Sequence, residues 1–173
     1  EEGVAVAELI AGHHPTINYL AIPNVAYTHP EVAAVGLTEE EVNLRKIPYR
    51  ASQFPFKANS RARCMDQEEG FVKILAEEKS RRIIGIHILG PHASELIGEA
   101  TLAIQLKATA DQLAQTCHAH PTLSSCHPTH KPLQFVRMVE READSATAGA
   151  LGAPEMALDL VEIGMRELWI GAE

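Results

Sequence analysis

Short runs of apolar and β-branched residues in the first half of the chain predict β-strands. The clearest pair, at 70–76 and 82–89, is joined by the charged turn 77–81, which is the pattern of an antiparallel hairpin. We expect this hairpin at the centre of a sheet. Shorter runs that bring the number of predicted strands to about five lie at 24–28, 32–37 and 49–56. The first two are expected to form a corner, because Pro30 interrupts the pairing between them.

Other segments have apolar residues at the spacing of α-helices. The run at 1–11 stops at Gly12, a residue type that commonly ends helices. Threonine followed three residues later by Glu or Gln forms a capping box and predicts helices near 39–46 and 109–116. The segment 94–106 predicts an amphipathic helix that covers one face of the sheet. Strands followed by helices indicate an α+β domain with an antiparallel sheet and flanking helices.

Composition and charge restrict the classes of partner. The formal net charge of −8 argues against nucleic acid or an anionic membrane surface. No apolar run approaches the ~18 residues of a membrane span, and no basic segment precedes an apolar one at the N-terminus. Three cysteines at irregular spacing are typical of a reducing compartment. We therefore predict a soluble protein of the cytoplasm, or of the mitochondrial matrix if the source is eukaryotic.

The segment 117–125 carries the strongest candidate chemistry. It places two imidazoles one residue apart, at His118 and His120, and closes them with Pro121. Histidine titrates near neutral pH, so an imidazole held in place can take a proton from a thiol and return it. Pro121 favours an extended backbone at His120, which suits a side chain that projects from a short loop. Two ordinary loop histidines would have the same spacing.

Four stretches of the chain carry motifs that occur in the same order in one family. They are PNVAYTHPEVAAVG at 23–36, FPFKANSRA at 54–62, IIGIHILGP at 83–91 and HAHPTLS at 118–124. Together they resemble the C-terminal dimerisation domain of dihydrolipoamide dehydrogenase, a flavoprotein of the pyridine nucleotide-disulfide oxidoreductase family. Glutathione reductase and mercuric reductase share the architecture, but the surroundings of His120 and the loop 54–63 favour the lipoamide enzyme.

The resemblance implies that the chain is part of a longer enzyme. Residues 1–17 would be the end of an FAD-binding domain. Residues 18–125 would be the dimerisation or interface domain, and residues 126–173 a divergent tail. In the tail, Pro128 and Pro132 interrupt the final helix of the family. Apolar residues at helical spacing in 133–143 and 154–170 leave two interpretations open, a replaced or out-of-frame tail and an appended helical hairpin.

The resemblance also assigns roles in the loop. In the family, this loop crosses to the partner subunit, where its second histidine faces the flavin and the redox-active disulfide. His120 would deprotonate dihydrolipoamide so that the thiolate attacks the disulfide, after which electrons pass through FAD to NAD. His118 and Pro121 would support this base, and His120 and Pro121 would contact the flavin of the partner subunit.

Position 125 departs from the family pattern. Ser125 stands where the family has a Glu that orients the imidazole and stabilises its protonated form. A hydroxyl can orient a ring but brings no negative charge, so we expect a weaker base.

The chain lacks the motifs that would make it a complete enzyme. It has no Gly-x-Gly-x-x-Gly fingerprint for a dinucleotide and no closely spaced cysteine pair for a redox disulfide. We therefore expect this chain alone to bind neither FAD nor NAD and to be inactive. The resemblance implies a homodimer through the interface domain and docking of the basic subunit-binding domain of a lipoyl acyltransferase.

A metal-binding module is the main alternative. Six potential zinc ligands lie within the fourteen residues 117–130: Cys117, His118, His120, Cys126, His127 and His130. They lack the Cys-x-x-Cys spacing of standard zinc fingers, so we expect no metal site. A non-catalytic interaction module built on the same segment is a further alternative.

Overall fold

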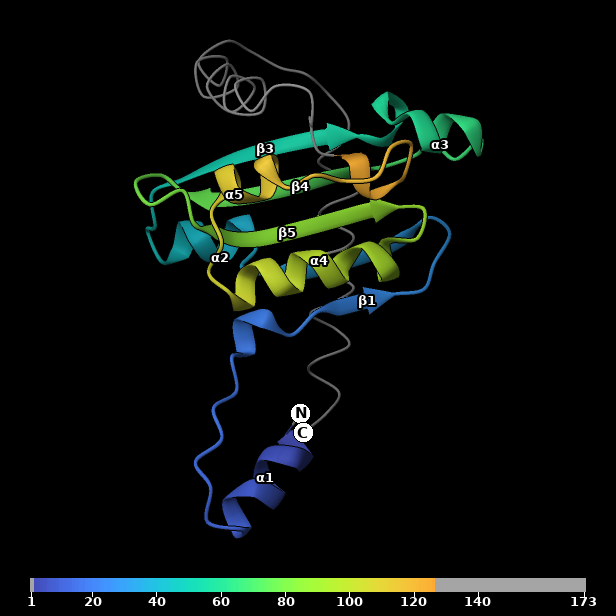
Figure 1. Ribbon diagram of the computed structural model, residues 1–173. Coiled ribbons are helices and arrows are strands. Elements are labelled where there is room, and N and C mark those ends of the chain that lie inside the picture. Colours follow the sequence, from blue (N-terminus) through green and yellow to red (C-terminus); the bar gives the residue numbers. More distant parts are fainter. Residues whose placement is uncertain (1, 127–173) are drawn as a thin grey trace. The chain divides into compact units, whose positions relative to one another are not determined.

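The computed structural model describes residues 2–126, so the predicted tail and its two helical segments lie outside the described residues. Five strands form one antiparallel sheet in the order β1-β2-β5-β4-β3 (Figure 1). In chain order they are β1 Asn24–Ala26, β2 Glu31–Gly36, β3 Tyr49–Pro55, β4 Phe71–Glu77 and β5 Ile83–Gly90. The predicted fold class is confirmed, and β5 lies at the centre of the sheet.

The β4–β5 hairpin and its neighbour β2 supply the apolar face of the sheet. Ile74 lies opposite Ile86, and Ile86 lies opposite Val35 on the other side of β5. Because side chains alternate along a strand, residues two positions away along the strands face the same way. The side chains of this face are all buried: Ala33, Val35, Val72, Ile74, Ile86 and Ile88. This face forms the main core.

The predicted corner at Pro30 is wrong. β1 and β2 pair directly as antiparallel neighbours, with Val25 opposite Ala33. Proline ends the pairing locally, as expected, but the chain then reverses and stays in the same sheet. The sequence showed the interruption but not the partner of each strand.

Two helices cover the apolar face, and their packing follows their amphipathic patterns. α4, Ala93–Gln105, packs on β2 and β5 and buries Ile97, Ala100, Ala103 and Ile104. α5, Ala110–Gln115, adds Ala110 and Leu113 to the same core. Its predicted capping box is present, because Thr109 and Gln112 exchange side chain to backbone hydrogen bonds. The chain leaves α5 directly into the histidine segment.

α2, Glu39–Leu44, packs on the opposite face of the sheet. It begins with the predicted capping box between Thr38 and Glu41. Val42 is buried against Leu37 and Leu75 in a second, smaller apolar cluster. Leu75 neighbours Ile74 along β4 and therefore points to the other face.

The connection after β3 contains two short helices that matter for the site. The 3-10 helix η2, Phe56–Ala58, is followed by α3, Ser60–Cys64. The ring of Phe56 is fully buried and lies against Gly90 so closely that a Cβ there would be 2.3 Å from the ring atom Cε2. This contact ties the start of the connection to the end of the central strand.

The remaining elements are short or exposed. They are α1 Glu2–Ile10 and the 3-10 helices η1 Tyr19–Ala21 and η3 Ser124–Cys126. α1 has no buried residue. In the described part of the chain, the helices are too short or too polar to cross a membrane.

Candidate active-site loop

The histidine segment is an irregular loop that begins where α5 ends. The hydroxyl of Thr116 donates to the carbonyl of Gln112 at 3.0 Å, which closes the last turn of the helix. The loop then runs through His118 and His120 to η3, and the peptide bond between His120 and Pro121 is cis. The two histidines differ sharply in their surroundings.

His118 points into the domain. Its side chain is 7% exposed, and its Nε2 lies 2.6 Å from Oε1 of Glu99 on α4. Its Nδ1 lies 3.0 Å from the carbonyl oxygen of Thr116. A ring enclosed in this way cannot reach a substrate bound outside the domain. The supporting role that the resemblance implies for His118 stays a prediction.

His120 has the opposite orientation. His120 and Pro121 are both exposed, as is Cys117 on the other side of His118. The imidazole of His120 can therefore approach another molecule or another subunit. The loop therefore carries one exposed imidazole and one that faces the domain interior.

A compact turn follows Pro121. The hydroxyl of Thr122 donates to the carbonyl of Ala119 at 2.6 Å, and the hydroxyl of Ser125 donates to the carbonyl of Thr122 at 2.7 Å. The amide of Ser125 donates back to the Thr122 hydroxyl at 3.2 Å. The position where the family has a carboxylate is thus used here for a turn.

Asn59 connects this turn to the start of α3. Its Nδ2 donates to the carbonyl oxygens of Thr122 and Leu123 at 3.1 and 3.3 Å. Its Oδ1 accepts from the amides of Arg61 and Ala62 at 2.9 and 3.0 Å, which caps the helix. Asn59 is only 2% exposed, so both ends of its amide are used inside the protein.

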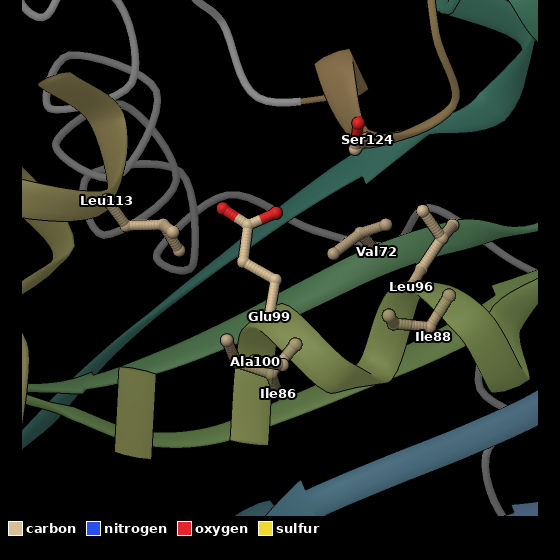
Figure 2. A pocket seen from close by; sticks show the side chains of 8 residues that line it. All are labelled: Val72, Ile86, Ile88, Leu96, Glu99, Ala100, Leu113 and Ser124. Atoms are coloured by element: carbon tan, nitrogen blue, oxygen red, sulfur yellow. The ribbon is translucent and has the colours of Figure 1, made fainter. Parts of the chain in front are cut away.

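A small cavity lies between α4, the sheet and the loop (Figure 2). Its lining residues are Val72, Ile86, Ile88, Leu96, Glu99, Ala100, Leu113 and Ser124. Figure 2 shows Glu99 projecting from α4 into the space between this helix and the segment that carries Ser124. The volume of about 20 Å³ is enough for one water molecule and far too small for a substrate.

The structure brings His118, His120, Pro121 and Ser125 into one loop, but sequence patterns did not identify Glu99 or Asn59. A weak signal existed for Glu99, since it lies three residues after Leu96 and four before Ala103, next to the apolar side of α4. A charged group there needs a partner. No comparable signal exists for Asn59, whose loop contacts are more than sixty residues away in sequence.

The zinc alternative gains no support from the described residues. Among residues 2–126, no group of three or more His, Cys, Asp or Glu side chains could hold a metal ion. Two of the six proposed ligands, His127 and His130, lie outside the described part of the chain.

Comparison with known proteins identifies the domain. A family model described as pyridine nucleotide-disulphide oxidoreductase, dimerisation domain, matches residues 22–130. The chain belongs to this family. The predicted resemblance is therefore confirmed, and the sheet with its flanking helices is the fold of this family's dimerisation domain.

Several relatives are about 50% identical to this chain over the matched 124 residues. Dihydrolipoyl dehydrogenase 1, mitochondrial, of Arabidopsis thaliana is 52% identical over 124 residues, which are 72% of this chain and 24% of that protein. Dihydrolipoyl dehydrogenase, mitochondrial, of Dictyostelium discoideum is 53% identical over 124 residues, with 72% and 25% covered. The chain spans about a quarter of the length of these relatives.

Solved structures agree on the fold. LpdA from Mycobacterium tuberculosis superposes with a TM-score of 0.69 at 28% identity, covering 82% of this chain and 29% of that one. The flavoprotein disulfide reductase RclA from Escherichia coli gives a TM-score of 0.66 at 19% identity, covering 79% and 30%. The second likeness shows the fold alone.

Proposed function

We propose that this dimerisation domain supplies His120 as the proton-transferring base to the active site of the partner subunit in a dihydrolipoyl dehydrogenase-like enzyme. The observation that carries the proposal is the exposure of His120 on a loop whose neighbouring residues are bound inside the domain. The cavity beside the loop holds no more than one water, so the reacting groups come from elsewhere in the assembly.

The chemistry requires a base at this position. A dithiol substrate such as dihydrolipoamide attacks a protein disulfide as its thiolate, because the thiol is a poor nucleophile. The imidazole of His120 takes the thiol proton and later releases it. In the parent enzyme, bound FAD and NAD would supply the capacity for this two-electron oxidation. His120 and Pro121 are exposed and therefore available to face the partner's flavin.

An exposed apolar patch on α4 and η1 supports assembly as a homodimer. Leu102 lies on α4, and Leu106 follows the end of this helix as its C-cap; they are 57% and 69% exposed. Tyr19 and Leu20 of the adjacent η1 are 64% and 44% exposed. We call these four residues the α4–η1 patch. Burying such a patch against a second copy is favourable because it removes apolar surface from water.

The wider assembly follows from the same proposal. The relatives named above carry the word mitochondrial in their names, so we place the parent enzyme in the mitochondrial matrix. The net charge of −8 favours a basic protein partner, and the subunit-binding domain of a lipoyl acyltransferase has that character. The 173-residue chain by itself is not expected to oxidise dihydrolipoamide.

A chimeric enzyme tests the role of His120. Residues 22–125 replace the corresponding segment of the Arabidopsis dihydrolipoyl dehydrogenase, and NAD-linked oxidation of dihydrolipoamide is measured. His120→Gln should lower kcat about 10²–10⁴-fold, the range for loss of a general base. The matched control is His29→Gln, which removes another exposed imidazole and should leave kcat unchanged. Equal turnover of His120→Gln and the unsubstituted chimera would exclude the proposed base.

A further inference from the structure

We propose that Glu99 and Asn59 are positioning residues that hold the loop on both sides of His120. This inference rests on the proposed function and deepens it, because it names the groups that orient the imidazole of His120. Glu99 acts through His118, two residues before His120. Asn59 acts through the backbone of Thr122, two residues after it.

The first anchor is the contact between the imidazole of His118 and the carboxylate of Glu99. Both ring nitrogens of His118 face acceptors, namely the carbonyl of Thr116 and the carboxylate of Glu99. The side chain of His118 is 7% exposed and that of Glu99 is 36% exposed, so the ring lies inside the domain while the carboxylate still reaches its edge. The pair fixes the loop to α4.

The second anchor is the amide of Asn59. Each of its two polar atoms makes two hydrogen bonds, which uses the full capacity of a side-chain amide. Two of these bonds hold the loop, and the other two hold the first turn of α3. Because Asn59 is only 2% exposed, water cannot easily replace a lost donor. This side of the loop is thereby fixed to a segment that Phe56 anchors to β5.

The two anchors leave a short span with the base at its centre. His118 and Thr122 are four residues apart and are bound to different elements, which restricts the backbone of His120 between them. Catalytic efficiency depends strongly on such restriction, because misplacement of a base by about 1 Å can cost ~10²-fold in rate. The restriction matters more here than in the family, since Ser125 offers His120 no carboxylate to orient it.

Substitutions can separate the anchors from their other structural roles. Asn59→Asp keeps the oxygen that caps α3 but removes both donors to the loop. Its matched control is Asn18→Asp, because Asn18 also caps a short helix with its oxygen and donates from its amide nitrogen. Glu99→Gln removes the charge beside His118, and Glu95→Gln removes an exposed charge from the same helix.

Hydrogen exchange of the 173-residue chain, followed by NMR, measures the effect on the loop without any catalysis. The reporters are the amides of Thr122 and Ser125, which both donate hydrogen bonds within the turn. Asn59→Asp and Glu99→Gln should each accelerate their exchange about tenfold, as expected for loss of one or two hydrogen bonds. The two controls should leave it unchanged, as should the amides of β5 in all variants.

A ring signature tests the contact between His118 and Glu99 separately. The ¹⁵N signals of the His118 ring should shift in Glu99→Gln, which changes the partner of Nε2, and should stay unchanged in Glu95→Gln. In the chimeric enzyme, both substitutions should lower kcat about tenfold with little change in KM. Added to His120→Gln, they should lower it no further.

Two results would overturn the proposal. One is unchanged exchange at Thr122 and Ser125 in both loop variants. The other is a full additional loss of kcat in the His120→Gln background, since an anchor can act only through the base that it positions. If Asn59→Asp does not fold, Asn59→Ser replaces it, because serine also caps helices but lacks the amide donors. Failure of His120 as the base would leave the exchange result intact, so the two proposals fail separately.

Discussion

His87 should make the stability of the domain fall as the pH is lowered below neutrality. The residue lies in the central strand β5, where its Nε2 donates to the carbonyl of Leu37 at 3.1 Å. Burial lowers the pKa of His87, and the positive charge of Lys73 lowers it further. The Leu37 carbonyl and the carboxylates of Glu39 and Glu41 act in the opposite direction but do not reverse the shift.

The sign of the effect follows from proton binding. Below the ordinary histidine pKa of 6.5, the unfolded chain takes up a proton at position 87 while the folded chain does not. The free energy of unfolding therefore falls as the pH drops from 6.5 and levels off below the pKa of the folded state. The slope is at most about 1.4 kcal/mol per pH unit for one group.

Urea unfolding at pH 7.5 and pH 5.5 measures this term. His87→Gln keeps a donor for the Leu37 carbonyl and cannot titrate, so its loss of stability between the two pH values should be smaller than that of the unsubstituted chain, by at most about 1.4 kcal/mol. His29→Gln, which removes an exposed histidine, should behave like the unsubstituted chain. Identical pH dependence in all three proteins would refute the reasoning.

Three further predictions concern assembly, the loop and the core. Leu102→Asp combined with Leu106→Asp should convert a dimer to a monomer in sedimentation velocity. Leu44→Asp, at an exposed residue outside the α4–η1 patch, should not. A dimer in the double variant would contradict the role of the patch as the dimer interface. Ser125→Glu should raise kcat of the chimeric enzyme about tenfold, the effect of one hydrogen bond to a charged group, and unchanged kcat would make a carboxylate there dispensable. Gly90→Ala should lower the free energy of unfolding by about 1–3 kcal/mol in urea titrations, because the added methyl collides with a buried ring; unchanged stability would mean that the ring moves aside freely.

The elements that depend on local patterns could be predicted from the sequence. The β4–β5 hairpin, α4 and both capping boxes appear within one or two residues of the expected ranges. Each of these signals is local: residues three or four positions apart for the helices and caps, and two apolar runs joined by a charged turn for the hairpin. The pairing of β1 with β2 was missed because a proline indicates only where a strand stops, and not where the next strand lies in the sheet.

In the candidate site, too, the sequence identified the residues of a local motif but not their distant partners. The histidines, Pro121 and Ser125 occur together in a short motif, so the sequence could identify them. The partners that hold this motif lie far from it in the chain: Glu99 is nineteen residues from His118, and Asn59 is sixty-three from Thr122. Asparagine and glutamate are also common on protein surfaces, and only the fold distinguishes the two that are turned inward.

The same activity can be lost in two physically different ways if the proposed function holds. A base that is exposed on one subunit and used by the other works only while the subunits are paired and the loop holds His120 in the correct orientation. Substitutions in the α4–η1 patch should abolish turnover together with the dimer. Raising the protein concentration should restore both. Damage at Glu99 or Asn59 should lower turnover in an intact dimer at every concentration. Turnover and sedimentation measured together over a dilution series therefore distinguish loss of the dimer from misorientation of His120.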